Sequence, residues 1–216
     1  MRIARVGLIL PTLYAALVLA GGPAPSATPT AAVTPAANAT PAAPAAGAGN
    51  YAVDPAKSWL GFTARQSGGD VDGRFEKFTA RITFSDANLA ASRFNVDVTT
   101  QSVNTQDDNR DTVLRDTDLF NVAKFPTAHF VTSAFARKAP GQYEATGKLT
   151  IRDVTREIHL PFTFQSAQEG GKSVAWLKGG LTVNRLDYGV GQGEWQDTSV
   201  VENPVRIQFE LRLLPQ

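Results

Sequence analysis

The stretch Y-E-A-T-G-K-L-T-I-R-D-V-T-R-E-I-H-L-P-F-T-F, from Tyr143 to Phe164, holds two runs in which small or apolar residues alternate with polar ones. The small or apolar positions are Ala145, Gly147, Leu149 and Ile151 in the first run, and Ile158, Leu160, Phe162 and Phe164 in the second. Successive side chains of a β-strand point to opposite faces, so each run has one apolar face. Residues 152–156 suit a hairpin loop in which Asp153 adopts a left-handed backbone. The stretch therefore predicts an antiparallel hairpin with an apolar inner face.

The same alternation recurs before and after this hairpin and predicts about eight strands in all. The further strands are expected at residues 58–65, 73–84, 94–99, 128–135, 175–183 and 205–211. Residues 107–121 break the alternation, because their charged residues surround Val113, Leu114 and Phe120 at a spacing that suits a short amphipathic helix or a pair of helical turns. Phe125 precedes a proline, which ends the helical segment.

Strands of this number and spacing are typical of an all-β barrel or of a β-sandwich. Large side chains, above all the 12 phenylalanines, point to one face of nearly every strand. Closing an eight-stranded antiparallel sheet places that face inside and removes the exposed sheet edges, which favours the barrel. The small inward residues Ala145, Gly147, Ala175 and Gly179 indicate room for one ligand, although small residues also allow tight packing.

The chain before the strands has the pattern of an exported protein. Residues 1–20 resemble a secretory signal peptide, because Arg2 and Arg5 precede a mostly apolar run. The alternative is an uncleaved membrane anchor, but the run is shorter than the roughly 20 apolar residues that span a bilayer. Residues 21–49 are rich in Ala, Pro and Thr and predict an extended, disordered linker. The folded domain is expected at residues 50–216, in the periplasm.

The composition argues against several classes of function. The chain has no cysteine, which rules out lipoprotein attachment, disulfides, thiolate metal sites and a cysteine nucleophile. The whole chain has 21 basic and 20 acidic side chains, and Arg2 and Arg5 precede the domain, which therefore carries 19 against 20, a formal charge of −1. That balance argues against nucleic acid as the main partner and against a polybasic membrane-binding surface.

Few residues suit catalysis or metal binding. The candidates are His129 and His159 within strands, the carboxylates of Asp107, Asp108 and Asp111, and the glycine-rich run 189–193. We interpret the histidines as structural or surface residues, since no further ligands accompany them. The aspartates lack the spacing of a calcium loop and suit the start of a helix, and the glycines lack the lysine and the helix of a phosphate loop. We therefore expect no enzymatic activity, no metal and no cofactor.

Several motifs together resemble the YceI family. They are D-P-A-K-S-W-L-G-F (54–62), G-R-F-E-K-F (73–78), R-D-T-V-L-R-D-T-D-L-F (110–120), K-F-P-T-A-H-F (124–130), G-K-L-T-I-R-D-V-T-R (147–156) and N-R-L-D-Y-G-V-G (184–191). The resemblance covers residues 51–214 and implies an eight-stranded, antiparallel, lipocalin-like barrel that is periplasmic and binds a polyisoprenoid lipid. The segment G-E-W-Q-D-T (193–198) resembles a subgroup associated with b-type membrane cytochromes, which implies an isoprenoid quinone as ligand.

The apolar residues of the expected inner face are the candidates for a lipid-lined tunnel. These candidate ligand-binding residues are Leu60, Phe62, Phe75, Phe78, Ile82, Phe84, Phe94, Val96, Val98, Leu114, Phe120, Phe130, Leu149, Ile151, Leu160, Phe162, Leu177, Leu181, Tyr188 and Trp195. Tyr188 and Trp195 lie in the loop before the last strand, where a mouth is expected.

Four charged residues occupy family motif positions: Arg110, Asp111, Arg185 and Asp187. We expect them to form a salt-bridge network that pins the helical insertion around residues 107–121 to the barrel, with head-group binding as the alternative. Many family members have histidine at the positions of Lys57 and near Gln66, and the usual turn glycine is Asp153 here. Contacts between those histidines and a head group therefore do not carry over to this chain.

Three hypotheses follow. The leading one is an exported protein that holds a polyisoprenoid chain, either an isoprenoid quinone or a polyprenyl phosphate, as a carrier, a store or a stress-related factor. The second is a non-catalytic structural or interaction barrel tethered near a membrane partner. The third, an enzyme acting on a lipid, requires polar residues inside the barrel. The expected partners are an isoprenoid lipid and a transient contact with a membrane or membrane cytochrome, and the protein is expected to be a monomer or homodimer.

Overall fold

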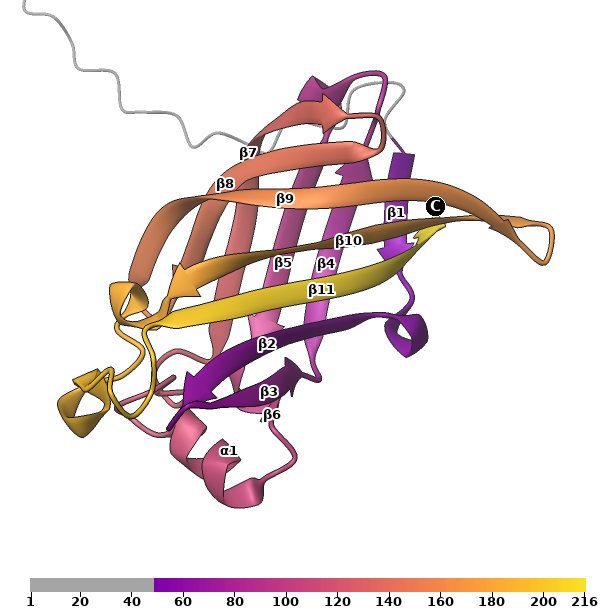
Figure 1. The fold of residues 1–216 in the computed structure, drawn as a ribbon. Helices are drawn as coiled ribbons and strands as arrows, with labels where there is room; N and C mark the ends of the chain where they lie inside the picture. The colour runs from indigo at the N-terminus through magenta and orange to yellow at the C-terminus, as the bar shows by residue number, and fades with distance from the viewer. Residues whose placement is uncertain (1–48) are drawn as a thin grey trace, which may run out of the picture. The chain divides into compact units, whose positions relative to one another are not determined.

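The structure is a computed structural model that describes residues 49–216, and its strands form one antiparallel sheet (Figure 1). The expected signal peptide and all but the last residue of the expected linker lie outside the described residues. Eight strands form the barrel wall in the order β1 (Gly49–Val53), β4 (Phe78–Phe84), β5 (Arg93–Thr99), β7 (Thr127–Ala139), β8 (Gln142–Ile151), β9 (Val154–Glu169), β10 (Lys172–Asn184) and β11 (Pro204–Pro215). The pairing of β1 with β11 closes the ring. The prediction of an all-β, eight-stranded antiparallel barrel is confirmed.

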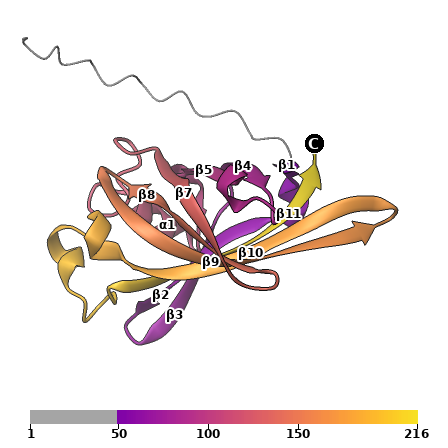
Figure 2. The ribbon, with the colours of Figure 1, turned by 90° about the horizontal axis from the view of Figure 1, so that it is seen from above.

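The remaining elements lie beside this wall. They are β2 (Trp59–Gln66), β3 (Gly69–Phe75), the two-residue β6 (Val103–Asn104), the helix α1 (Asp108–Arg115), and the 3-10 turns η1 (Pro55–Lys57), η2 (Leu89–Ala91), η3 (Thr100–Ser102), η4 (Arg185–Tyr188) and η5 (Gly193–Gln196). Strand β2 pairs with β11 on one edge and with β3 on the other, so the hairpin β2–β3 branches from the barrel. Seen from above, the β9–β10 hairpin projects beyond the other strands (Figure 2).

Strand β1 is the strand of the barrel wall that the alternation pattern did not predict. The first expected strand at residues 58–65 is β2, which is not part of the closed ring, and the expected strand 73–84 divides into β3 and β4. Tyr51 of β1 pairs with Ile82 of β4 and with Pro215 of β11, and these pairs join the two ends of the barrel wall. Five residues are too few to show a clear alternation, so only the pairing reveals the strand.

The central hairpin differs from expectation at its turn. Strand β9 already begins at Val154, so the loop has two residues, Arg152 and Asp153, where five were expected. The left-handed residue is Arg152, with φ of 56°, and not Asp153. The Arg152 guanidinium donates hydrogen bonds to the backbone carbonyls of Thr117 and Leu119, which hold the turn against the helical insertion.

The helical insertion contains one short helix followed by turns. Helix α1 ends at Arg115, so it spans only the first half of the expected segment 107–121. The Asp107 carboxylate caps it by accepting a hydrogen bond from the backbone N–H of Arg110 at 3.0 Å, which satisfies one of the unpaired donors of its first turn. In the described part of the chain, no helix is long and apolar enough to cross a membrane.

Aromatic rings fill one end of the barrel. We call this group the aromatic plug, and it consists of Phe84, Phe94, Phe135, Tyr143, Phe162 and Phe164. The centroid of Phe84 lies 4.4 to 6.3 Å from those of the other five rings, a range in which edge and tilted contacts are favourable. Strand β5 begins at the plug and runs toward η3 and α1, so the plug and α1 lie at opposite ends of the barrel.

The inward glycines do not provide the empty space that the sequence indicated. A Cβ added at Gly147 would lie 2.7 Å from the ring of Phe130, and one added at Gly179 would lie 2.8 Å from the ring of Phe209. These aromatic rings therefore occupy the space above the glycines, and Ala145 is fully buried. The interpretation of these positions as vacancies is wrong, because small residues here accommodate large neighbours.

Phe162→Ala is expected to lower the free energy of unfolding by about 3–5 kcal/mol, because it leaves a void in the close-packed plug. The matched variant Phe62→Ala should lose clearly less, because the Phe62 side chain is only half-buried. Urea denaturation of both variants measures the difference. Equal losses would show that the plug is no better packed than the rest of the interior.

Candidate functional site

An apolar cavity of about 260 Å³ lies between the aromatic plug and α1. Eighteen of the expected ligand-binding residues line it: Leu60, Phe62, Phe75, Phe78, Ile82, Phe94, Val96, Val98, Leu114, Phe120, Phe130, Leu149, Ile151, Leu160, Leu177, Leu181, Tyr188 and Trp195. The two others, Phe84 and Phe162, do not line it, and their rings pack against each other within the plug. Alternation assigns a side chain to the inner face of the barrel but not to a position along its axis. Contact with a ligand stays a prediction for all of the expected ligand-binding residues.

Part of the cavity lining was not predicted from the sequence. Val205, Ile207, Phe209 and Leu211 of β11 line the cavity, although they were not among the expected ligand-binding residues. The signal was present, since these residues alternate with polar ones in the strand expected at 205–211. They could have been included on the same argument as the residues of the other strands.

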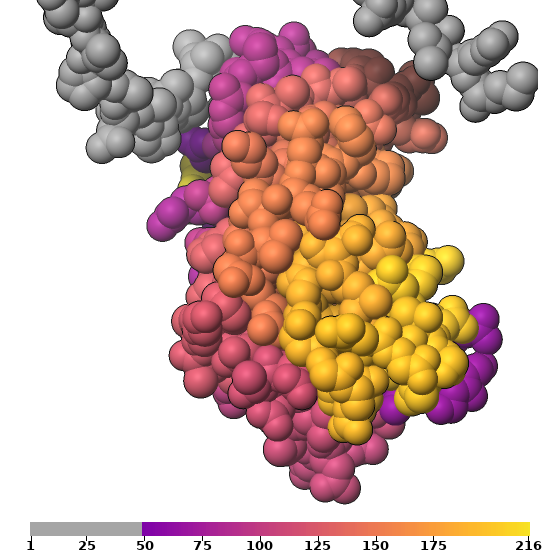
Figure 3. Space-filling view, turned by 90° about the vertical axis from the view of Figure 1, so that its left-hand side faces the viewer, coloured from indigo at the N-terminus to yellow at the C-terminus, as the bar shows by residue number. Residues whose placement is uncertain are grey.

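The end of the barrel near α1 is covered by a second apolar cluster. Leu119, Tyr188 and Val190 form its buried centre, and Trp195 packs against it. Tyr188 is only 2% exposed, so the mouth expected at this residue is not open, and burial raises the pKa of the Tyr188 phenol. Backbone N–H groups of Gly191 and its successor donate to the carbonyl of Asp118, and Figure 3 shows the loop before β11 beside the helical insertion.

Arg185 lines the cavity, but its guanidinium is engaged by the backbone. It is 6% exposed, and it donates hydrogen bonds to the carbonyls of Glu202 at 3.1 Å, Val190 at 3.1 Å and Val201 at 2.7 Å. Burial lowers the pKa of Arg185, although an arginine stays protonated in proteins. All three nitrogens are used in joining two segments of the loop before β11, so the geometry favours a structural role for Arg185 over head-group binding.

The expected salt-bridge network between the helical insertion and η4 does not form within the described residues. Asp111 is buried and accepts hydrogen bonds from the backbone N–H and the hydroxyl of Thr105, at 2.8 and 2.7 Å. Arg110 contacts Asp107 of its own segment at 3.3 Å. Asp187 accepts from the amide of Asn184 at 3.4 Å. Hydrogen bonds to backbone groups therefore hold the insertion where side-chain ion pairs were expected.

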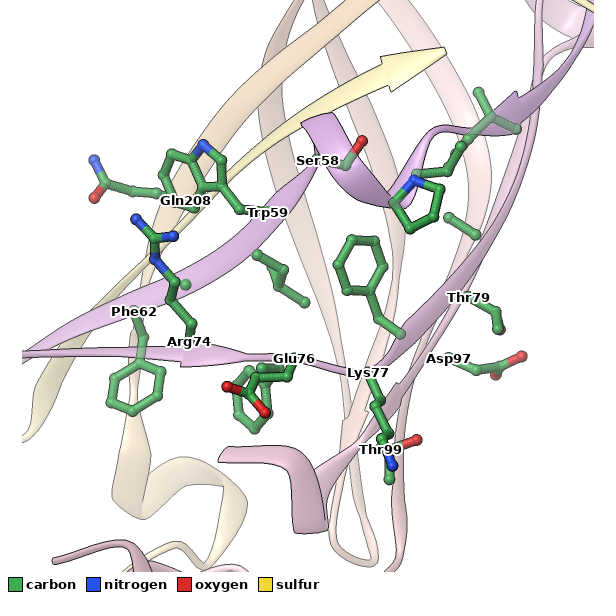
Figure 4. Close-up of a pocket in the computed structure, with 18 of the residues that line it drawn as sticks. Ser58, Trp59, Phe62, Arg74, Glu76, Lys77, Thr79, Asp97, Thr99 and Gln208 are labelled. Atoms are coloured by element: carbon green, nitrogen blue, oxygen red, sulfur yellow. The ribbon is translucent and has the colours of Figure 1, made fainter. Parts of the chain in front are cut away.

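A large lateral gap opens in the barrel wall beside the cavity. Strand β1 pairs with residues 82–84 of β4 and then turns toward β11, so residues 78–81 have no strand partner on that side. We call the space between residues 78–81 of β4 and residues 59–63 of β2 the wedge. Its volume is about 1650 Å³, and Figure 4 shows Trp59 and Arg74 on one of its sides and Thr79 on the other.

The wedge and the cavity share apolar residues. Leu60, Phe62, Phe75, Phe78 and Ile82 border both spaces. The rest of the wedge lining includes polar and charged residues such as Arg74 and Lys77, whereas these five shared residues are apolar. The two spaces therefore meet at a common apolar surface within the wall.

An ion cluster lies beside the wedge, where the chain crosses from β1 to β2. Arg212 of β11 lies 2.7 Å from the carboxylate of Asp54 and 2.8 Å from that of Glu169. Its backbone N–H donates to the hydroxyl of Ser58 at 2.9 Å. These contacts tie β11, the β1–β2 connection and the β9–β10 hairpin together at one point, so they position β2 relative to β1.

The histidines lie on the outer face of the barrel. The Nδ1 atom of His129 is 2.6 Å from a carboxylate oxygen of Asp97, and that of His159 is 3.2 Å from the hydroxyl of Thr146. Within residues 49–216, no three histidine, aspartate or glutamate side chains come together as a metal site.

Comparison with known proteins places this barrel in a family. Residues 51–213 match the YceI-like domain family. The chain belongs to this family. A UPF0312 protein of Vibrio cholerae is 30% identical over 151 residues, which are 68% of this chain and 80% of that protein.

Solved structures of YceI-like proteins have the same fold. BcnA of Burkholderia cenocepacia is 33% identical, with a TM-score of 0.69 over 74% of this chain and 98% of its own. The YceI protein of Campylobacter jejuni is 23% identical, with a TM-score of 0.63 over 68% and 86% of the two chains. A polyisoprenoid-binding domain from Saccharophagus degradans is 18% identical, with a TM-score of 0.59 over 77% and 98%. The last two show the fold alone.

Glu169→Gln is expected to destabilise this YceI-like barrel at neutral pH but not in acid. Hydrogen bonding to Arg212 holds the pKa of Glu169 below its ordinary value of 4.5. The pKa of Glu169 is therefore lower in the folded protein than in the unfolded protein. Its contribution to stability is fully present above pH 4.5 and is lost as the pH falls through the pKa of the folded protein. The urea midpoints of the parent protein and of Glu169→Gln are measured between pH 7 and pH 3, and they should converge in acid.

A difference in midpoint that stays constant with pH would contradict the ionic role of Glu169. The control is Glu157→Gln, on the exposed outer face.

Proposed function

We propose that this YceI-like protein binds the chain of a polyisoprenoid lipid inside its barrel and acts in the periplasm as a carrier, store or stress-related factor. The observation that carries the proposal is the apolar cavity between the plug and α1, with its lining of aliphatic and phenylalanine side chains. Such a lining offers almost no hydrogen-bonding groups. It therefore suits a ligand that is held by burial of hydrocarbon surface.

The magnitudes agree with tight binding. Burial of apolar surface contributes roughly 25 cal/mol per Å². A forty-carbon tail at about 0.3 kcal/mol per heavy atom would gain about 12 kcal/mol, which corresponds to nanomolar affinity. No covalent chemistry is needed for a carrier of this kind.

The comparisons support a linear isoprenoid as the ligand. One solved relative of the same fold is a polyisoprenoid-binding domain, and its fold covers 77% of this chain. A linear chain also suits a barrel that is closed at one end by the aromatic plug. We propose an isoprenoid quinone or a polyprenyl phosphate as the ligand, and a transient contact with a membrane or a membrane cytochrome as the point of exchange.

Native mass spectrometry of the mature protein tests the ligand. It is expected to detect a lipid-bound form after purification, or after incubation with an octaprenyl quinone or with undecaprenyl phosphate. Protein that stays unliganded with both probes would contradict the proposal and favour the structural or interaction module.

Val96→Trp tests the place of binding. Val96 lines the cavity and is only half-buried, so a larger ring there should occupy space meant for the ligand. The added ring has about seven more heavy atoms than valine, and displacing as many ligand atoms is expected to weaken binding by roughly 30-fold. Binding is measured by titration in native mass spectra, with urea denaturation to check the fold. Val131→Trp on the exposed outer face is the control and should bind as the parent does.

A further inference from the structure

The cavity alone is too small for a long isoprenoid. Its volume of about 260 Å³ lies just below the range of roughly 300–1,000 Å³ that is usual for sites of drug-sized ligands. A chain of forty carbons is longer than such ligands. If the proposed function holds, part of the bound lipid must therefore lie outside the cavity, in a space that is continuous with it.

The barrel end at the aromatic plug offers no such space. The rings of Phe84 and Phe164 are 4.4 Å apart, and those of Phe94 and Phe135 are 4.8 Å apart. Phe84, Phe94 and Phe162 are each no more than 3% exposed. A lipid that passed this end would have to separate a close-packed set of aromatic rings.

The end near α1 is the rival route, and it is both covered and acidic. The cluster of Leu119, Tyr188 and Val190 fills its centre. Cavity-lining residues reach the surface there at Val113, which is 37% exposed. The exposed carboxylates around this end are those of Asp108, Asp116, Asp118, Glu194 and Asp197. The cations beside them already have carboxylate partners, since Arg110 lies 3.3 Å from Asp107 and Arg115 lies 3.8 Å from Asp111. Such a rim repels an anionic head group and an anionic membrane surface.

The wedge has space for the rest of the lipid and an apolar surface continuous with the cavity. Its charged residues also differ from those at the end near α1. The carboxylates on its rim already have partners: Asp72 accepts from Thr63 at 2.6 Å, Glu76 from Asn104 at 2.7 Å, and Asp97 contacts His129 at 2.6 Å.

The cations on the same rim are exposed, and they have no carboxylate within 4.0 Å among residues 49–216. They are Arg74, Lys77 and Arg81, and the guanidinium of Arg74 lies over the ring of Trp59. The three cations balance the three carboxylates of the wedge rim in formal charge, so the wedge repels an acidic or electron-rich polar group less than the rim at α1 does.

We propose that the wedge is the lateral half of the lipid site: the isoprenoid enters between β4 and β2, its tail fills the cavity, and the rest of the chain with its polar end lies in the wedge. This inference rests on the proposed function. It assigns the ligand class, an amphiphile with a long isoprenoid chain and a polar end that accepts hydrogen bonds or carries negative charge. The unpaired edge at residues 78–81 is what leaves the wall open for it.

Site-specific labelling can separate the two routes, because the chain has no native cysteine. Ala80→Cys places a thiol on the β4 side of the wedge, and Asn109→Cys places one on α1, at an exposed position that does not line the cavity. Val131→Cys on the outer wall is the control. Each variant is treated with a bulky maleimide and then titrated with undecaprenyl phosphate and with an octaprenyl quinone in native mass spectra.

The label at residue 80 is expected to weaken binding of both probes by about tenfold or more, whereas the labels at 109 and 131 leave binding within about threefold of the unlabelled variants. Tight binding to the protein labelled at 80, or a loss only with the label at 109, would overturn the lateral site. Failure of the unlabelled variants to bind either probe would instead contradict the proposed function itself.

Discussion

The architecture depends on how one strand shares a single edge between two partners. Strand β11 has 12 residues, and β10 occupies one of its edges. On the other edge, residues 213–215 pair with β1 and residues 206–210 pair with β2. The first pairing closes the barrel, and the second diverts the β2–β3 hairpin away from β4. Closure of the wall and the gap within it therefore have the same origin.

Packing divides the interior into two regions with different roles. At one end, rings of Phe84 and its neighbours contact one another closely and exclude both solvent and ligand. In the middle, half-buried side chains such as Phe62 and Val96 border the cavity. Dense aromatic packing supplies stability, since it removes large apolar surfaces from water. The middle of the barrel can therefore keep a cavity for hydrocarbon while the protein stays folded.

Backbone groups, more than ion pairs, hold the segments that cover the barrel. The buried guanidinium of Arg185 joins two parts of the loop before β11 through three carbonyls. Asp111 is satisfied by Thr105. Buried charges need hydrogen-bond partners, and backbone carbonyls or N–H groups can supply them. A compact ion cluster around Arg212 lies where the chain crosses from β1 to β2.

The sequence by itself determined the all-β class, the antiparallel hairpin at residues 143–164 and half of the cavity lining, because a period of two assigns each side chain to one face. It did not determine depth along the barrel, so Phe84 and Phe162 were grouped with residues that line the cavity. Only the tertiary structure decided that a strand of five residues at Gly49–Val53 closes the ring and that the wall opens beside it. Those features follow from pairing between segments more than 100 residues apart, and no local pattern records such a pairing.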